Sequence, residues 1–167
     1  MFSAQPKRLY ESPPVNVVLV EPRIPPNTGN VARLCAASAC HLVLVGPMGF
    51  ELSDAKLKRA GLDYWEYVSW EYHESLAAFL NTVPPSTLHL LSAKASTPYT
   101  RIPAAPGDFL VFGSETTGLG ANVLKRFPDQ CYTVPMAEPR VRSINLSAAV
   151  AIVVYDVLRR LRPFELS

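Results

Sequence analysis

The chain has few cysteines, no long hydrophobic run and almost no net charge. Its 167 residues include three cysteines, and Cys35, Cys40 and Cys131 form no C-x-x-C pair and have no histidine cluster beside them. This spacing argues against a disulfide framework and against a zinc site. We therefore expect small, mostly buried thiols and no metal centre.

The missing hydrophobic run and the missing charge limit location and partners. No stretch approaches the length of a membrane span, and the first residues lack the apolar core of a secretory signal, so we expect a cytoplasmic protein that does not bind membranes. Sixteen Lys and Arg against fourteen Asp and Glu leave a net charge of +2. Nucleic-acid binding cannot be argued from so small a charge, and a polyanionic partner would have to meet a local basic patch.

The order of apolar runs predicts one α/β domain. Residues 1–14 are polar and proline-containing, which predicts a loose N-terminal extension before a single domain at 15–167. Short β-branched runs at 15–20 and 41–45 predict strands buried on both faces, with a helix between them that Asn27 or Thr28 caps. Further helices are predicted at 53–61, 73–83, 121–127 and 143–161, and further strands at 87–93, 108–114 and 131–136. The alternation predicts a mostly parallel sheet with helices on both faces.

Three unusual loops follow predicted strands, where ligands of open parallel sheets bind. They read "EPRIPPNTGN" (21–30), "FGSETTGLG" (112–120) and "VPMAEPRVRSINLSAA" (134–149). The second loop does not have the spacing of a P-loop, and no G-x-G-x-x-G follows the first strand, so a standard nucleotide cradle is poorly supported. If this chain were an ordinary nucleotide-binding α/β protein, it would therefore have to bind the phosphates without either of these motifs.

Taken together and in order, "PPNTGNVARLCAA", "FGSETTGL" and "VPM…RSINLSAAVAIVVYD" resemble the three motifs of the SPOUT superfamily of RNA methyltransferases. "GPMGFELSDAKLKRAGLDYWEYV" adds a likeness to its TrmL type, tRNA ribose 2′-O-methyltransferases acting at the wobble nucleotide, a cytidine or modified uridine at position 34. The similarity covers Val15 to about Arg160. It implies a deep C-terminal trefoil knot, S-adenosylmethionine as methyl donor, the tRNA anticodon stem-loop as substrate and a homodimer whose active site uses both chains.

The resemblance also implies cofactor contacts, several of them through the backbone. Main-chain groups would bind the adenine edge and the ribose, while Leu and Val side chains pack on the ring. From the residues alone, Leu91 and Val134 are more simply interpreted as core residues at strand ends. We expect Glu115 and Asn145 to shape the loops and orient the substrate. The implied cofactor-binding residues are Leu91, Gly113, Glu115, Gly118, Val134, Met136 and Ser143.

Arg33 is the residue to which the resemblance assigns the catalytic role, in some members as a general base. A guanidinium stays protonated in proteins, so we prefer a role in gripping the phosphate beside the target nucleotide, with a phosphate oxygen or water receiving the proton. A surface arginine with no catalytic role is the plain alternative. The other expected catalytic residues are Asn30, Ser143, Asn145 and Tyr155.

The last predicted helix is apolar or small around most of its circumference, which suggests cover by a second subunit. Scattered basic residues would then converge on one cleft for RNA: Lys56, Lys58, Arg59, Lys94, Arg101, Arg140 and Arg142.

Two alternative functions stay open. One is a SPOUT 2′-O-methyltransferase with another tRNA position or ribosomal RNA as target. The other is a knotted RNA-binding protein without catalysis.

Overall fold

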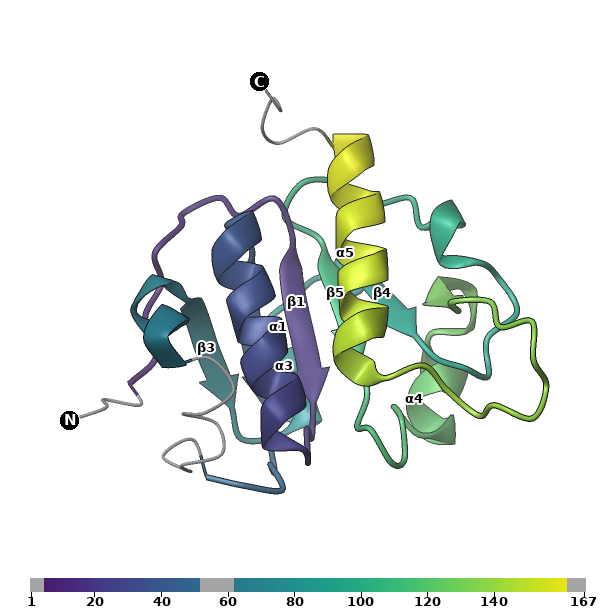
Figure 1. The fold of residues 1–167 in the computed structure, drawn as a ribbon. Coiled ribbons are helices and arrows are strands. Elements are labelled where there is room, and N and C mark those ends of the chain that lie inside the picture. Colours follow the sequence, from purple (N-terminus) through teal and green to yellow (C-terminus); the bar gives the residue numbers. More distant parts are fainter. Residues whose placement is uncertain (1–4, 52–61, 162–167) are drawn as a thin grey trace.

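The computed structural model describes residues 5–51 and 62–161, and one parallel sheet organises this part of the chain (Figure 1). Its six strands lie in the order β3-β2-β1-β5-β4-β6, and every pairing is parallel. The strands are β1 (Asn16–Val20), β2 (His41–Val45), β3 (Ser69–His73), β4 (Leu88–Leu91), β5 (Phe109–Phe112) and β6 (Cys131–Tyr132). The α-helices are α1 (Pro25–Ser38), α3 (Leu76–Leu80), α4 (Ala121–Arg126) and α5 (Leu146–Leu161), and the 3-10 turns are η1 (Leu62–Tyr67), η2 (Pro85–Thr87), η3 (Tyr99–Arg101) and η4 (Pro128–Gln130).

Both faces of the sheet are covered, because alternate residues of each strand enter different cores. On β1, Val17 and Leu19 pack in a core that includes α1 and α5, whereas Val18 and Val20 pack in a core that includes Phe79 of α3. The helices α1 and α5 contact each other and lie side by side over the first face (Figure 1). The predicted α/β class with a parallel sheet is confirmed. The C-terminal knot stays a prediction.

Several predicted boundaries were wrong. The edge strand β3 was not predicted. The helix expected at 73–83 is only the five residues of α3, and the strand expected at 131–136 ends at Tyr132. The last helix begins at Leu146 rather than at 143. The helix expected at 53–61 lies outside the described residues.

The predicted cap of the first helix was also wrong. Asn27 and Thr28 lie inside α1, and their backbone N–H groups donate to the Ile24 carbonyl at 3.0 and 3.4 Å. The helix begins at Pro25 with an extended Ile24 as its N-cap. Proline has no N–H to satisfy and its φ suits the first helical turn, so the two prolines set the start without a side-chain cap.

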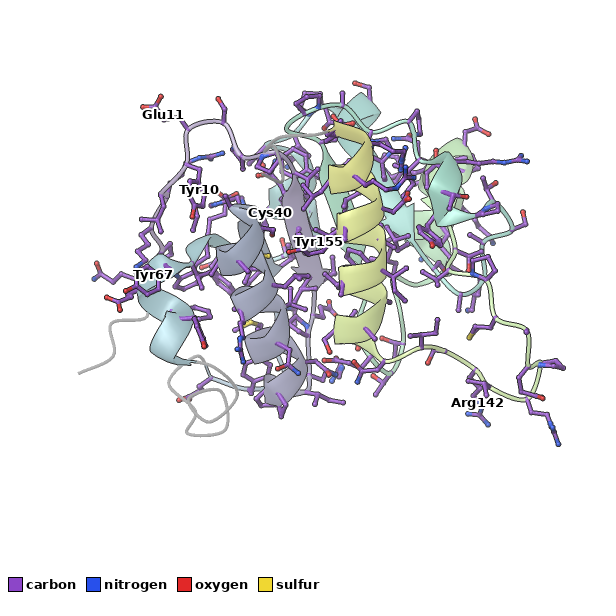
Figure 2. All side chains as sticks on the ribbon, turned by 45° about the horizontal axis from the view of Figure 1, so that its top comes forward. Tyr10, Glu11, Cys40, Tyr67, Arg142 and Tyr155 are labelled. Carbon is purple, nitrogen blue, oxygen red and sulfur yellow. The ribbon has the colours of Figure 1, made fainter. Side chains whose placement is uncertain are left out.

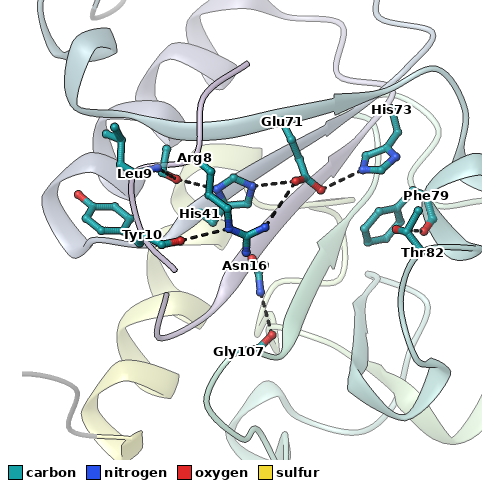
Figure 3. A network of polar contacts seen from close by, with 11 residues as sticks. Arg8, Leu9, Tyr10, Asn16, His41, Glu71, His73, Phe79, Thr82 and Gly107 are labelled. Atoms are coloured by element: carbon teal, nitrogen blue, oxygen red, sulfur yellow. Dashed lines mark hydrogen bonds and ion pairs between the residues drawn. The ribbon is translucent and has the colours of Figure 1, made fainter. Parts of the chain in front are cut away.

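A polar network at the sheet edge joins β2, β3 and the amino-terminal segment (Figure 3). His41 is 1% exposed, and its ring nitrogens lie 2.8 Å from Ser69 Oγ and 3.2 Å from Glu71 Oε2. Glu71 also contacts His73 at 2.9 Å. Hydrogen bonding from His41 is the main cause that lowers the pKa of Glu71 from 4.5 to about 2, against the opposing effect of burial.

Residues from the predicted N-terminal extension contact this edge. Lys7 pairs with Trp70 through two backbone hydrogen bonds of 3.0 and 2.8 Å, and Leu9 N donates to Ser69 Oγ. Arg8 lies 3.9 Å from Glu71. The strand β3 therefore has an antiparallel neighbour on its open side. The boundary between extension and domain at residues 14 and 15 stays a prediction.

The buried cysteines agree with the sequence-based expectation. Cys35 and Cys40 are buried, Cys131 is half-buried, and all three are free thiols. Burial is the main cause that raises the pKa of each thiol. Within residues 5–51 and 62–161, no group of three His, Cys, Asp or Glu side chains is arranged to hold a metal ion. No helix in this part of the chain combines the length and the apolar character needed to span a membrane.

Candidate functional site

A cavity of about 620 Å³ lies at the carboxyl ends of β1, β5, β4 and β6. Each of these strands contributes the segment that follows it, which is where ligands bind in open parallel sheets. The walls come from the start of α1, the end of β4 and the residues after it (91–94), residues 113–120 after β5, residues 133, 134 and 136 after β6, residues 142–146, and Ala149 of α5. The three loops singled out in the sequence therefore meet at one place.

Glu115 connects the second loop to the start of α1. Its carboxylate accepts hydrogen bonds from the backbone N–H groups of Arg23 and Ile24 at 2.9 and 3.1 Å, and from Asn27 Nδ2 at 3.4 Å. A carboxylate at a helix N-terminus satisfies free donors and interacts favourably with the helix dipole. Glu115 thus provides, from a distant loop, the cap that α1 lacks in its own sequence.

Asn145 connects the third loop to the same point. Its Nδ2 donates to Asn27 Oδ1 at 3.1 Å, so Asn27 lies between Glu115 and Asn145. Asn145 Oδ1 accepts from Ser147 Oγ at 2.7 Å and from Ala148 N at 3.3 Å, which caps the first turn of α5. We call Glu115, Asn27 and Asn145 the cavity network. It joins all three loops through side chains.

Asn27 is the site residue that the sequence-based reasoning missed as a contact. It was assigned only a possible capping role, yet it is 7% exposed, lines the cavity and hydrogen-bonds to both neighbouring loops. An asparagine directly after two prolines that begin a helix cannot be the cap. Its position in the sequence therefore indicates that its side chain bonds to another part of the chain and not to its own helix.

The structure places every residue with an expected cofactor role on the cavity wall, although their contacts with a cofactor stay a prediction. These residues are Leu91, Gly113, Glu115, Gly118, Val134, Met136 and Ser143. Gly113 is packed so closely that a Cβ added there would overlap the backbone of Gly118 and Leu119. The loop after β5 turns back on itself at this point, with Gly118 N donating to the Ser114 carbonyl at 2.9 Å. Only glycine permits that close approach.

The chemistry of this wall suits an adenosine-type ligand. In the described part of the chain, no protein group hydrogen-bonds to the backbone N–H or C=O of Val134 or Met136. Both residues are half-buried and line the cavity. Main-chain N–H and C=O groups without a protein partner can bind the edge of a base, and apolar side chains beside them offer contact area for a ring. Leu91, which is 8% exposed, offers a further apolar contact on the same wall. Together these residues fit S-adenosylmethionine.

Three residues with expected catalytic roles do not line this cavity. Arg33 and Asn30 are exposed on α1, one helical turn apart, and Tyr155 is 46% exposed on α5 (Figure 2). Ser143 and Asn145 do line it. Within one chain, therefore, the expected catalytic arginine and the expected cofactor pocket are separate.

Of the basic residues expected around one cleft, some line the cavity and others do not. Lys94 and Arg142 line the cavity, and Figure 2 shows Arg142 on the loop that leads into α5. Arg140 is exposed and forms an ion pair with Glu138 at 2.7 Å, which lowers the pKa of that carboxyl and raises the pKa of the guanidinium. Arg101 is exposed on η3. Lys56, Lys58 and Arg59 lie outside the described residues.

Comparison with known proteins gives a consistent result. Residues 14–155 match the model of the SpoU rRNA Methylase family. A tRNA (cytidine(34)-2′-O)-methyltransferase of Burkholderia ambifaria is 47% identical over 148 residues, which cover 87% of this chain and 94% of that protein. A solved structure described as "Structural insights into the 2-OH methylation of C/U34 on tRNA" is 43% identical, with a TM-score of 0.84 over 90% of this chain and 97% of the other.

The fold extends to more distant structures. The SpoU methyltransferase AviRb from Streptomyces viridochromogenes, solved in complex with the cofactor AdoMet, has a TM-score of 0.77 at 19% identity. The match covers 90% of this chain and 59% of AviRb. At that identity the comparison concerns the fold alone.

Proposed function

This chain belongs to the SpoU rRNA Methylase family, and we propose that it transfers a methyl group from S-adenosylmethionine to the ribose 2′-OH of the wobble nucleotide of tRNA, a cytidine or modified uridine at position 34. The observation that carries the proposal is the 47% identity with a tRNA (cytidine(34)-2′-O)-methyltransferase over nearly the whole of both chains. The cavity at the carboxyl ends of the strands supports it, because its walls suit the donor.

In this proposal the residues after β4, β5 and β6 hold the donor, whose sulfonium supplies an activated methyl group. The backbone groups of Val134 and Met136 would bind the adenosine portion, and the side chain of Leu91 would pack on the ring. The cavity network would fix the three loops relative to one another. Such fixed geometry matters because methyl transfer requires an in-line approach by the ribose oxygen.

Arg33 would orient the RNA rather than accept a proton. Its guanidinium is a permanent donor that can grip a phosphate with two N–H groups, so the ribose proton would pass to a phosphate oxygen or to water. Because Arg33 does not line the cavity of its own chain, we propose that a second copy supplies it. Asn30, on the same exposed side of α1, would assist in holding the nucleotide.

A homodimer would bring the two halves of the site together. The outer side of α5 exposes Ile152 and Tyr155, which are 38% and 46% exposed. Apolar and aromatic surface of this kind on a helix rich in small residues suits packing against another helix. The dimer would also enlarge the basic surface available to the anticodon stem-loop.

The test of the activity is nucleoside mass spectrometry of tRNA incubated with the purified protein and S-adenosylmethionine. We expect a 2′-O-methylated nucleoside that maps to position 34. Methylation confined to another tRNA position or to ribosomal RNA would replace the wobble assignment. Donor binding by calorimetry without transfer to any RNA would favour a non-catalytic RNA-binding protein.

The shared active site is tested by mixing two inactive variants, Arg33→Ala and Gly113→Ala. The first should bind donor without transferring methyl, and the second should not bind donor. After subunit exchange, mixed dimers contain one site with both an intact pocket and an intact Arg33, so activity should reappear. Failure of every mixture to recover activity, while wild-type subunits exchange under the same conditions, would place Arg33 and the pocket of one chain in the same site.

A further inference from the structure

Arg33 has one close aromatic neighbour. Its guanidinium carbon lies 4.5 Å from the centre of the Tyr64 ring. Within the described residues, the Arg33 side chain has no hydrogen bond and no ion pair with another side chain. Among the residues that the structure describes, this long and exposed cation is therefore placed by a ring rather than by a carboxylate.

The turn that carries Tyr64 is firmly attached to the rest of the fold. The next residue, Trp65, is 5% exposed and packs on Trp70 with ring centres 5.2 Å apart. Val68 N donates to the Trp65 carbonyl at 3.1 Å, and η1 packs along α1. On the outer side, Lys7 Nζ donates to the Glu66 carbonyl. Tyr64, itself 38% exposed, is thus held at the surface beside Arg33.

An aromatic neighbour and an acidic neighbour would have different effects on a phosphate-binding arginine. A carboxylate would occupy the N–H groups of the guanidinium and compete with the phosphate for them. A ring attracts the cation through its face and leaves the N–H edge free for a ligand. It also restricts the side chain before RNA arrives, which reduces the entropy lost on binding.

We propose that Tyr64 is a positioning residue for Arg33 in methyl transfer. This inference rests on the proposed function, and it adds a residue that lies 31 positions further along the chain than the arginine it holds. Tyr64 acts through Arg33 on the orientation of the RNA. It does not contribute to donor binding, because it lies outside the cavity wall.

The experiment compares Tyr64→Leu with Tyr64→Phe in the full chain, using tRNA and S-adenosylmethionine. Loss of the ring face in Tyr64→Leu should lower kcat/KM for tRNA about two- to fivefold, the effect expected of an exposed cation–π contact. Tyr64→Phe keeps the ring and should remain close to the wild-type rate. Donor affinity by calorimetry should not change in either variant, and the midpoint of thermal unfolding should fall by at most about 2–4 °C in Tyr64→Leu, because the contact is also present in the free protein.

Two controls separate positioning from other roles. Tyr67→Leu alters another exposed tyrosine of η1, 57% exposed, and should leave the rate unchanged. In an Arg33→Gln background, where methyl transfer is expected to be lost, Tyr64→Leu should cause no further loss of tRNA affinity, measured by fluorescence anisotropy. An equal loss in that background would mean that Tyr64 contacts RNA directly, which would overturn the proposal.

The wild-type reaction separates a failure of the role of Tyr64 from a failure of the proposed function. A wild-type protein that methylates tRNA, with Tyr64→Leu indistinguishable from it, overturns the role of Tyr64 and leaves the proposed function standing. A wild-type protein that methylates no tRNA overturns the proposed function itself, together with the role of Tyr64 in it.

Discussion

Two side-chain networks join distant parts of the chain, and they differ in what surrounds them. The cavity network of Glu115, Asn27 and Asn145 lies at the carboxyl ends of the strands, beside a cavity of about 620 Å³. The edge network of His41, Ser69 and Glu71 lies between β2, β3 and the amino-terminal segment, with His41 and Ser69 buried.

The edge network places serine, histidine and carboxylate in consecutive contact, an order that is familiar from hydrolases. Ser69 is fully buried and already accepts a hydrogen bond from Leu9 N at 2.9 Å, so no substrate can reach its hydroxyl. Access to solvent and ligand therefore decides what such a network can do. Polar residues that line a cavity can contact a ligand, whereas polar residues that are buried from solvent can only stabilise the fold.

The largest effect should come from Gly113→Ala. The added methyl group would overlap the backbone of Gly118 and Leu119, so the loop after β5 must shift. We expect donor affinity to fall by more than about tenfold, equivalent to about 1.4 kcal/mol, and methyl transfer to be lost. Calorimetry with S-adenosylmethionine measures the binding. The matched control is Gly107→Ala, outside the cavity wall, since a Cβ at Gly107 meets nothing within 4 Å and only its φ of +86° is unfavourable. Equal donor affinity in the two variants would contradict the close-packing argument.

Next in size should be Glu115→Ala. Removal of the carboxylate leaves the N–H groups of Arg23 and Ile24 without their acceptor and detaches the second loop from Asn27. We expect a loss of about 1–2 kcal/mol in the free energy of unfolding, as for a lost helix cap, together with a larger relative loss of turnover. Urea unfolding and the tRNA assay measure the two effects. Unchanged turnover in a destabilised protein would make Glu115 purely structural.

For the edge network the opposite pattern is expected. His41→Leu removes the partner of Ser69 and of Glu71 while filling most of the space. We expect the free energy of unfolding to fall by about 1–3 kcal/mol, because buried polar groups lose their hydrogen bonds. Turnover and donor affinity at 25 °C should stay at the wild-type level. A specific loss of turnover without loss of stability would break the division between the two networks.

The smallest effect concerns pH. The pKa of Glu71 is lowered from 4.5 to about 2, so between these values the unfolded chain binds a proton that the folded chain does not. The stabilisation from this carboxylate is complete above pH 4.5 and is lost as the pH falls toward 2. In Glu71→Gln, the free energy of unfolding should therefore depend less steeply on pH in this range, as urea titrations at each pH would measure. Glu138→Gln, at an exposed site, is the control and should change the slope less.

The parts of the fold that could be predicted are those with a strong local pattern. The runs at 15–20 and 41–45 are continuous and β-branched, and both became buried strands. The strand β3 was missed because "SWEYH" mixes aromatic, acidic and basic residues, and only its neighbours on both sides make it a strand. Tertiary context also shortened the predicted strand that begins at Cys131, because its pairing with β4 ends at Tyr132 and the next residue, Thr133, bonds instead to the backbone of Thr97 and Tyr99.

The candidate site was predictable as three loops but not as a network. Local sequence indicates glycine turns and helix starts, and the order of the motifs indicates the family. It cannot show that Glu115 reaches the start of a helix about 90 residues earlier, since that contact depends on the order of the strands in the sheet. The same holds for the contacts of His41 and His89, since each partner lies on a distant part of the chain. They lie against Glu71 and Asp108 respectively.

The pairing of Lys7 with Trp70 has a consequence for behaviour in solution. An uncovered outer strand offers unpaired backbone groups to the strands of other molecules and promotes aggregation. Here the two backbone hydrogen bonds between Lys7 and Trp70 occupy the N–H and C=O of the second residue of β3, and the charged residues Lys7 and Arg8 lie along the same edge. Lys7 and Arg8 thereby cover part of the outer strand against self-association, and removing them should affect solubility before it affects the cavity at the carboxyl ends of the strands.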